Sequence, residues 1–194
     1  MFWAYLYIAA WVIFVVLVFW FGIEFWLGPV GRAAPKIPSS RGLRDAVVKE
    51  IQKHYPDAKM VLDIGSCYGG MARMVARVLP NAHVIGVEKM LGAFMVSKIL
   101  RIFWQERNVN FVRADFFKFI EKQARGKNAP MFDIGVAYLL TSMMDRVEAV
   151  ADDFRVMLVL DFPLPNRKPT RKYKLHKDFL GQHWLYVYEN KKIK

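Results

Sequence analysis

Hydrophobic and polar positions change their spacing along the chain, and each change predicts a different element. No charged side chain occurs in residues 1–23, so a helix there would be apolar on every face. Residues 28–42 are rich in glycine and proline and have no apolar period, which predicts a linker. Apolar side chains then recur at helical spacing to about His54, and Ser40 or Ser39 is the expected N-cap of this helix.

Beyond this helix, β-branched runs alternate with segments of helical period. Strands are predicted at 60–64, 82–87, 109–113, 131–138 and 155–160, and helices at 70–79, 92–107, 116–124 and 142–151. Alternating strands and helices indicate a parallel sheet covered on both faces. Two last extended runs, 174–180 and 182–189, meet near Gly181 and predict an antiparallel hairpin at the sheet edge. The predicted fold is α/β: a Rossmann-like, doubly wound, mostly parallel sheet with a C-terminal antiparallel hairpin.

The apolar N-terminal segment predicts one transmembrane helix before this fold. A helix rises about 1.5 Å per residue, so residues 1–27 would span the roughly 30 Å hydrocarbon core of a bilayer. Trp3 at one end and Trp20 with Trp26 at the other suit the two membrane interfaces. A buried core helix is one alternative, and a cleaved signal peptide is disfavoured by the bulky residues at the segment's end. The expected organisation is an anchor over 1–27, a linker over 28–42 and a globular domain over 43–194.

Charge and cysteine content indicate where the globular domain works. Basic residues follow the apolar segment closely and none precedes it; they are Arg32, Lys36, Arg41 and Arg44. The positive-inside tendency predicts an outer N-terminus and a globular domain in the cytosol, or in the matrix of a mitochondrion. The formal net charge of +12 suits an anionic lipid surface as a partner. Cys67 is the only cysteine, which excludes an intrachain disulfide and agrees with a reducing compartment.

The stretch VLDIGSCYGG, residues 61–70, follows the first predicted strand of the sheet. Ligands of open α/β sheets bind beyond the carboxyl ends of the strands, closest to this turn. Its glycines lack the G-x-G-x-x-G spacing that binds a pyrophosphate, and Asp63 would repel that group. An ammonium group would be attracted instead. S-adenosyl-L-methionine carries one, and its carboxylate suits the backbone N–H groups of a glycine turn and helix start.

Two further acids end the next predicted strands. Glu88 closes the second strand, where a carboxylate can accept both hydroxyls of a ribose. Asp115 follows the third strand and could accept a hydrogen bond from an adenine amino group. We therefore predict S-adenosyl-L-methionine as the cofactor.

The motifs DIGSCYGG, GVEKM and RADFF, in this order and spacing, resemble the cofactor motifs of class I, seven-β-strand S-adenosylmethionine-dependent methyltransferases. The resemblance covers about residues 39–160. The cofactor-binding residues that it implies are Asp63, Gly65, Ser66 and Gly69 at the methionine end, Glu88 at the ribose and Asp115 at the adenine. Cys67 departs from the pattern, because these enzymes commonly have glycine there.

The whole layout suggests a narrower resemblance. An apolar N-terminus, the stretch PSSR at 38–41, DIGS and then RVMLVLDFPLP at 155–165 are similar to the small membrane-anchored lysine methyltransferases of ATP synthase subunit c and the adenine nucleotide translocase. This implies N-methylation of a lysine in a membrane protein. One alternative is methylation of a lipid, quinone or other small apolar acceptor. Another is a non-catalytic cofactor-binding or RNA-binding module, although no RNA-binding aromatic motif is present and nucleic acid is not expected as a partner.

Methyl transfer from a sulfonium needs an aligned nucleophile and exclusion of water, without a metal or a covalent intermediate. Tyr138, after the fourth strand, and Asp161, after the fifth, are the catalytic candidates. The alternative for Asp161 is an ion pair with Arg167 or Lys168. The histidines are His54, His83, His176 and His183. Their spacing is not that of metal ligands, so no metal site is expected.

Overall fold

The computed structural model describes residues 2–27, 39–124, 132–178 and 181–190. The chain divides into two compact units, Met1–Pro35 and Lys36–Lys194. The first contains the helix α1, Phe2–Leu27. The predicted helical conformation is therefore observed, but the predicted transmembrane anchor is not supported. A search of the described residues finds no helix with the length and hydropathy needed to cross a membrane.

The second unit begins with α2, Arg41–His54, whose start corrects the predicted linker. Ser40 caps this helix, because its side chain accepts a hydrogen bond from the backbone N–H of Leu43. Residues 41–42 thus belong to the helix, whereas residues 28–38 of the predicted linker lie outside the described part of the chain.

Seven strands form one sheet in the order β3-β2-β1-β4-β5-β7-β6. Their bounds are β1 Met60–Ile64, β2 His83–Glu88, β3 Val109–Arg113, β4 Phe132–Ala137, β5 Phe154–Leu160, β6 Arg171–Asp178 and β7 Gly181–Glu189. The first five strands are parallel, and β7 is antiparallel to both β5 and β6. The strand order reverses between β1 and β4. Ligands of this sheet type bind beyond the carboxyl ends of the strands at such a reversal.

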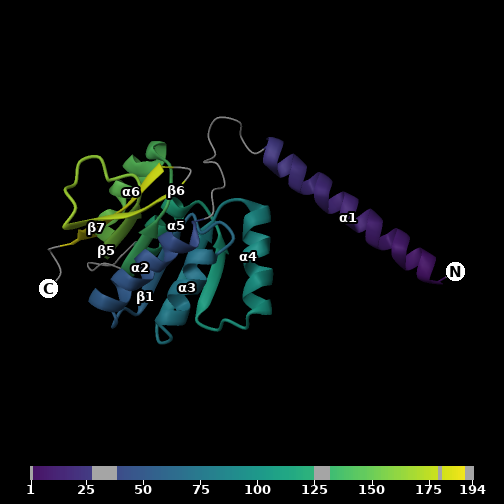
Figure 1. Cartoon of the computed structure of the whole chain (residues 1–194), viewed down its shortest axis with the longest axis horizontal. Coiled ribbons are helices and arrows are strands. Elements are labelled where there is room, and N and C mark those ends of the chain that lie inside the picture. Colours follow the sequence, from purple (N-terminus) through teal and green to yellow (C-terminus); the bar gives the residue numbers. More distant parts are fainter. Residues whose placement is uncertain (1, 28–38, 125–131, 179–180, 191–194) are drawn as a thin grey trace. The chain divides into compact units, whose positions relative to one another are not determined.

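Helices cover both faces of the sheet (Figure 1). They are α3 Gly70–Val78, α4 Leu91–Phe103, α5 Phe116–Ala124 and α6 Met144–Ala149. Apolar side chains of α2 and α3 pack in one core cluster, and those of α5 and α6 pack in a second cluster on the opposite face. The predicted doubly wound α/β fold is confirmed.

Two predicted helices differ from those observed. The helix predicted at 92–107 ends at Phe103, because Gln105 has a φ of 52° and this left-handed conformation cannot continue an α-helix. The helix predicted at 142–151 is divided into α6 and two flanking 3₁₀ turns, Thr141–Met143 and Ala151–Asp153.

The C-terminal hairpin is confirmed at the sheet edge. Along β7, Tyr186 and Tyr188 pack in the cluster with α5 and α6, while Leu185 and Val187 pack in the cluster with α2 and α3. This alternation is the period of two expected for a strand buried on both faces. Residues 179–180 of the predicted hairpin lie outside the described residues.

Candidate cofactor and acceptor site

The turn between β1 and α3 has an unusual backbone. Gly65, Cys67 and Gly69 all have positive φ values, 72°, 50° and 75° respectively. A Cβ on Gly69 would lie 2.3 Å from a ring carbon of Phe111, so both the conformation and the space at this position require glycine. Cys67 adopts the left-handed conformation despite its side chain, which stores strain in the turn.

Asp63 lies under this turn near the end of β1 and is only 5% exposed. Its Oδ2 accepts a hydrogen bond from the backbone N–H of Ala72 at 3.1 Å. Burial raises the pKa of the Asp63 carboxyl to about 7; the Ala72 N–H lowers it and the charge of Glu88 raises it further. A cation placed beside Asp63 would favour the ionised carboxylate, so the site suits a positively charged ligand.

Glu88 ends β2, the strand beside β1. Its Oε2 accepts from the N–H of Cys67 at 2.9 Å, and its Oε1 accepts from the N–H of Met90 at 2.7 Å. The carboxylate therefore connects the glycine turn to the start of α4. Glu88 is close enough to Asp63 for its charge to raise the pKa of the Asp63 carboxyl, as their strand positions predict.

Asp115, which follows β3, already has protein partners. Its Oδ1 accepts from Arg146 Nη2 at 2.9 Å and from the N–H of Phe117 at 3.1 Å. Burial alone would raise the pKa of Asp115, but Arg146 and the N–H groups at the start of α5 lower it overall. Asp115 thus caps α5 and anchors Arg146, and its predicted contact with adenine remains a prediction.

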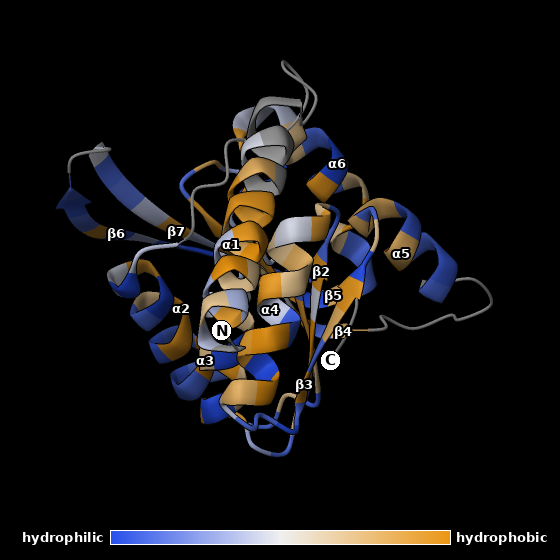
Figure 2. Cartoon of the chain, turned by 90° about the vertical axis from the view of Figure 1, so that its right-hand side faces the viewer, coloured by the Kyte–Doolittle hydropathy of each residue, from blue (hydrophilic) through white to orange (hydrophobic). Residues whose placement is uncertain are grey.

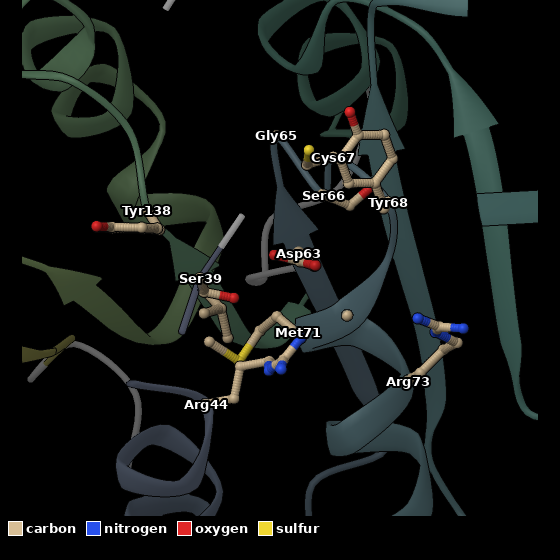
Figure 3. A pocket seen from close by; sticks show the side chains of 12 residues that line it. Ser39, Arg44, Asp63, Gly65, Ser66, Cys67, Tyr68, Met71, Arg73 and Tyr138 are labelled. Atoms are coloured by element: carbon tan, nitrogen blue, oxygen red, sulfur yellow. The ribbon is translucent and has the colours of Figure 1, made fainter. Parts of the chain in front are cut away.

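A pocket of about 150 Å³ opens beside the turn (Figure 3). Four of the predicted site residues line it: Asp63, Gly65, Ser66 and Tyr138. Gly69, Glu88, Asp115 and Asp161 are not among its lining residues. In Figure 3 the Asp63 carboxylate lies between the loop that carries Ser66 and the side chains of Met71 and Arg44.

Arg44 of α2 is a pocket residue that sequence reasoning did not assign to the site. A Cβ on Gly70 would lie 2.3 Å from Arg44 Nη1, so the guanidinium lies directly at the N-terminus of α3. Its Nε and the Oγ of Ser66 are buried without a hydrogen-bond partner among the described residues. A cation and a helix N-terminus together suit a carboxylate. Asp63 and Arg44 therefore fit the ammonium and the carboxylate of a methionine moiety.

Tyr138 and Asp161 follow β4 and β5 and interact with each other. The side chain of Tyr138 extends away from Asp63 (Figure 3). Burial, the charge of Asp161 and a hydrogen bond to Asp161 raise the pKa of Tyr138 to about 12, so its hydroxyl stays protonated and donates. Asp161 has a φ of 63°, a strained conformation of the kind that collects at functional sites. The two predicted catalytic candidates thus lie together at the carboxyl ends of neighbouring strands.

The partner of Asp161 is His183, a residue of β7 that sequence reasoning set aside. Asp161 Oδ2 lies 2.8 Å from His183 Nδ1, and Asp161 Oδ1 accepts from the N–H of Trp184 at 3.0 Å. Arg167, the predicted alternative partner, pairs with Asp152 at 2.8 Å. No local motif indicates the His183 contact, because it depends on β7 pairing beside β5.

Comparison with known proteins supports the fold assignment. No protein-family model matches the chain. A release factor glutamine methyltransferase of Geobacter sulfurreducens is 36% identical over 64 residues, which are 33% of this chain and 22% of that protein. The chain thus spans about a fifth of the length of this relative.

Solved structures of similar fold cover much more of the chain. An RNA methyltransferase from Salinibacter ruber in complex with S-adenosyl-L-homocysteine has a TM-score of 0.61 at 18% identity, over 79% of this chain and 93% of its own. TrmK of M. capricolum, in complex with the cofactor product S-adenosyl-homocysteine, has a TM-score of 0.58 at 7% identity, over 75% and 68%. A precorrin-6y C5,15-methyltransferase from Geobacter metallireducens has a TM-score of 0.56 at 12% identity, over 80% and 91%.

These structures share a fold and differ in the acceptors that their names give. The chain has the fold of class I S-adenosylmethionine-dependent methyltransferases, and two of the compared structures hold the demethylated product of that cofactor. The fold alone does not identify the acceptor.

Proposed function

We propose that this chain is an S-adenosylmethionine-dependent methyltransferase. The observation that carries the proposal is the buried Asp63 carboxyl under a strained glycine turn, at the point where the strand order reverses. A buried carboxylate without a compensating cation destabilises a fold. A cationic ligand that binds beside Asp63 explains why an acidic side chain occupies this buried position. The fold similarity to methyltransferases solved with S-adenosylhomocysteine supports the same assignment.

The residues present fit this cofactor. Asp63 would accept the ammonium, while Arg44 and the N-terminus of α3 would hold the carboxylate. Glu88 would accept from the ribose hydroxyls, since its carboxylate retains lone pairs beyond the two backbone hydrogen bonds. When bound, the cofactor supplies a methyl group on a sulfonium. The task of the chain is then to align an acceptor with that methyl and keep water out.

We propose the amine of a lysine side chain as the acceptor. Asp161 lies at this end of the sheet beside Tyr138, and its carboxylate attracts a cationic ammonium. The Tyr138 hydroxyl and the Asp161 carboxylate could hold the ammonium by hydrogen bonds, and Asp161 could then accept the proton that the amine must lose before it attacks the methyl group. The resemblance of PSSR, DIGS and DFPLP to membrane-anchored lysine methyltransferases supports a protein substrate, and a membrane protein in particular.

A labelling experiment tests both parts of this proposal. Membranes are incubated with the full chain and a methyl-labelled donor, and the labelled material is divided by extraction with organic solvent. We expect label in the protein fraction, reduced about tenfold or more by Asp63→Asn. Asp133→Asn is the matched control, because Asp133 accepts from the N–H groups of Lys59 and Met60 at the opposite end of the sheet. Label that survives Asp63→Asn would contradict the cofactor site, and label confined to the solvent extract would favour a lipid or quinone acceptor.

We also propose that the second unit works against an anionic membrane surface. The support is α4, whose buried residues are small and whose outer residues are large and apolar. Ile102 and Phe103 are each 73% exposed, and Met95, Ile99 and Trp104 are exposed as well. Figure 2 shows hydrophobic positions along much of α4. The helix carries Lys98 and Arg101 but no acidic residue. An exposed apolar stripe with basic flanks is typical of a helix that lies in a membrane interface.

Vesicle sedimentation of the unit that begins at Lys36, which contains both buried core clusters, tests this part. We expect the unit to sediment with vesicles of phosphatidylcholine and phosphatidylserine more than with phosphatidylcholine alone. The triple variant Ile99→Ser, Ile102→Ser, Phe103→Ser should bind these vesicles about tenfold or more weakly. Each substitution removes apolar surface from the contact with the membrane. The control Lys49→Ser alters an exposed position of α2. Equal binding by the triple variant and the control would refute the α4 contact.

A further inference from the structure

Two histidines and an aspartate meet at the end of the hairpin formed by β6 and β7. His176 and Asp178 are two residues apart on β6, so they point to the same face of the strand, and His183 lies across from them on β7. The imidazole centroids of His176 and His183 are 5.1 Å apart. One ligand atom from each of His176, Asp178 and His183 lies within 4.8 Å of the other two.

The orientation of His183 is already fixed. Its Nδ1 lies 2.8 Å from Asp161 Oδ2. A carboxylate oxygen accepts, so Nδ1 carries a proton and donates a hydrogen bond to Asp161. Its Nε2 points toward Asp178 Oδ2 at 2.9 Å. Nε2 is buried, and the Asp178 carboxylate is its close partner. A nitrogen and a carboxylate oxygen held this close can bind one metal ion together in place of a shared proton.

We propose that His176, Asp178 and His183 form a binding site for a divalent transition-metal ion, with Zn²⁺ as the best match. Two imidazole nitrogens and one carboxylate oxygen are ligands that Zn²⁺ accepts, with ligand distances of about 2.0–2.2 Å. Ligand atoms around a tetrahedral ion lie about 3.3 Å apart, from the same distances. Asp178 Oδ2 is 2.9 Å from His183 Nε2 and 3.9 Å from His176 Nε2, so a small rotation of the His176 ring completes the site.

The surroundings also suit a metal. Histidine ligands of metals commonly donate the other ring N–H to a carboxylate, and Asp161 occupies that position for His183. The ring of His176 packs on the backbone of α2, because a Cβ on Gly42 would lie 2.7 Å from its Cε1. His176 is 40% exposed, which leaves a path for the ion and room for a water as a fourth ligand.

A bound ion would join β6 to β7 next to the acceptor site. It would hold His183, and through it the Asp161 carboxylate that contacts Tyr138. Asp161 therefore has a part in both proposals: it contacts the acceptor in the methyltransferase proposal and orients His183 in the metal site. The metal site itself does not depend on the methyltransferase proposal, because metal binding is measured without cofactor or acceptor.

Calorimetric titration with ZnCl₂ tests the site on the full chain after removal of metals with a chelator. A Cys67→Ser background excludes binding by the thiol. We expect one Zn²⁺ per chain and a rise in the melting temperature, since a ligand that binds only the folded state stabilises it. His176→Ala removes one ligand and should weaken Zn²⁺ binding about tenfold or more. The chain should stay folded, because the His176 ring is the most exposed of the three ligands.

His83→Ala is the matched control, since His83 is an exposed histidine at the start of β2. Asp178→Asn provides a second variant, which keeps the size of the side chain but removes its charge. Co²⁺ in place of Zn²⁺ should give the visible absorption of a tetrahedral nitrogen and oxygen site, and His176→Ala should abolish it. Absence of stoichiometric Zn²⁺ binding, or equal affinity in His176→Ala and His83→Ala, would overturn the proposal.

Discussion

The Glu88 carboxylate accepts a hydrogen bond from the backbone N–H of Cys67, with 2.9 Å between Oε2 and nitrogen. The same carboxylate accepts from the N–H of Met90 at 2.7 Å. One side chain therefore joins the strained turn after β1 to the start of α4. The residue proposed to bind the ribose also holds the loop that is proposed to bind the methionine end, so the two halves of the cofactor site are coupled.

The first prediction follows from this coupling. Glu88→Ala removes the acceptor for two backbone N–H groups and for the ribose, and charge-assisted hydrogen bonds contribute about 1.5–3 kcal/mol each. We expect S-adenosylmethionine affinity to fall more than tenfold, and hydrogen exchange at the Cys67 amide to become faster in the cofactor-free chain. Unchanged exchange at Cys67 would show that the turn is held without Glu88.

A second prediction concerns the pH dependence of cofactor binding. Asp63 has a pKa of about 7 in the cofactor-free chain, and only its ionised form attracts an ammonium group. Affinity should therefore rise about tenfold per pH unit below pH 7 and level off above it. Calorimetric titrations between pH 5.5 and 8.5, set by that pKa, measure this slope. Asp63→Asn should bind weakly with no such slope, and the same slope in the variant would assign the titration to another group.

The third prediction concerns the stability of the cofactor-free chain. The pKa of Asp63 is raised from 3.8 to about 7 on folding, so the folded state binds a proton that the unfolded state has released between these values. The free energy of unfolding should therefore decrease as pH rises from about 4 to 7. The Asp63 contribution is on the order of 4 kcal/mol. Urea denaturation of the wild type and Asp63→Asn at pH 5 and pH 8, on either side of that pKa, measures this contribution. If the free energy of unfolding changed equally with pH in the two proteins, Asp63 would not be its source.

The fourth prediction concerns backbone strain. Cys67 has a φ of 50°, where an L-residue costs roughly 1–2 kcal/mol relative to glycine. Cys67→Gly should stabilise the chain by about 1 kcal/mol, because the greater freedom of glycine in the unfolded state offsets part of the gain. Gly69→Ala is the converse test: it should destabilise the chain by more than that, since its Cβ would overlap the Phe111 ring. Destabilisation by Cys67→Gly would show that the thiol contacts outweigh the strain.

The fifth prediction concerns the ion-pair network at the sheet edge. Arg171 Nη2 lies 3.1 Å from Glu50 Oε1 and 2.9 Å from Glu189 Oε1, and Glu50 is buried. Arg171→Met leaves Glu50 without this partner, so we expect a loss of about 3 kcal/mol in the free energy of unfolding. Arg155→Met is the control, because Arg155 pairs at 3.5 Å with the exposed Asp57 and such a pair contributes about 0–1 kcal/mol. Equal losses in the two variants would contradict the importance of burial.

Most of the fold could be predicted from local patterns, and its departures have local causes. The strand Met60–Ile64 and the helix Phe116–Ala124 were predicted at their observed bounds, because Gly65 follows the apolar run of the strand and Asp115 precedes that of the helix. The end of α4 could not be predicted. Gln105 lies in a stretch that favours helix, and only the structure gives its left-handed conformation.

The candidate site divides in the same way. Asp63 and Glu88 could be predicted as neighbours because each ends a strand and the strands are consecutive. Arg44 could not be predicted, since it reaches the pocket only through the packing of α2 against α3. His176, Asp178 and His183 are brought together by the hairpin register, which the sequence leaves open because residues of β6 alternate in exposure without a strong apolar face. The expectation of no metal site followed from the linear spacing of the histidines and from a methyl-transfer chemistry that needs no metal.

The central claim is that the pocket beside Asp63 recognises a sulfonium nucleoside through its amino acid end. Calorimetric titration of the full chain with S-adenosylmethionine, and separately with NAD, tests it most directly. We predict saturable binding of one S-adenosylmethionine per chain, no binding of NAD, and loss of the former in Asp63→Asn but not in Asp133→Asn. Equal S-adenosylmethionine affinity in Asp63→Asn and the wild type, or binding of NAD alone, would contradict the account.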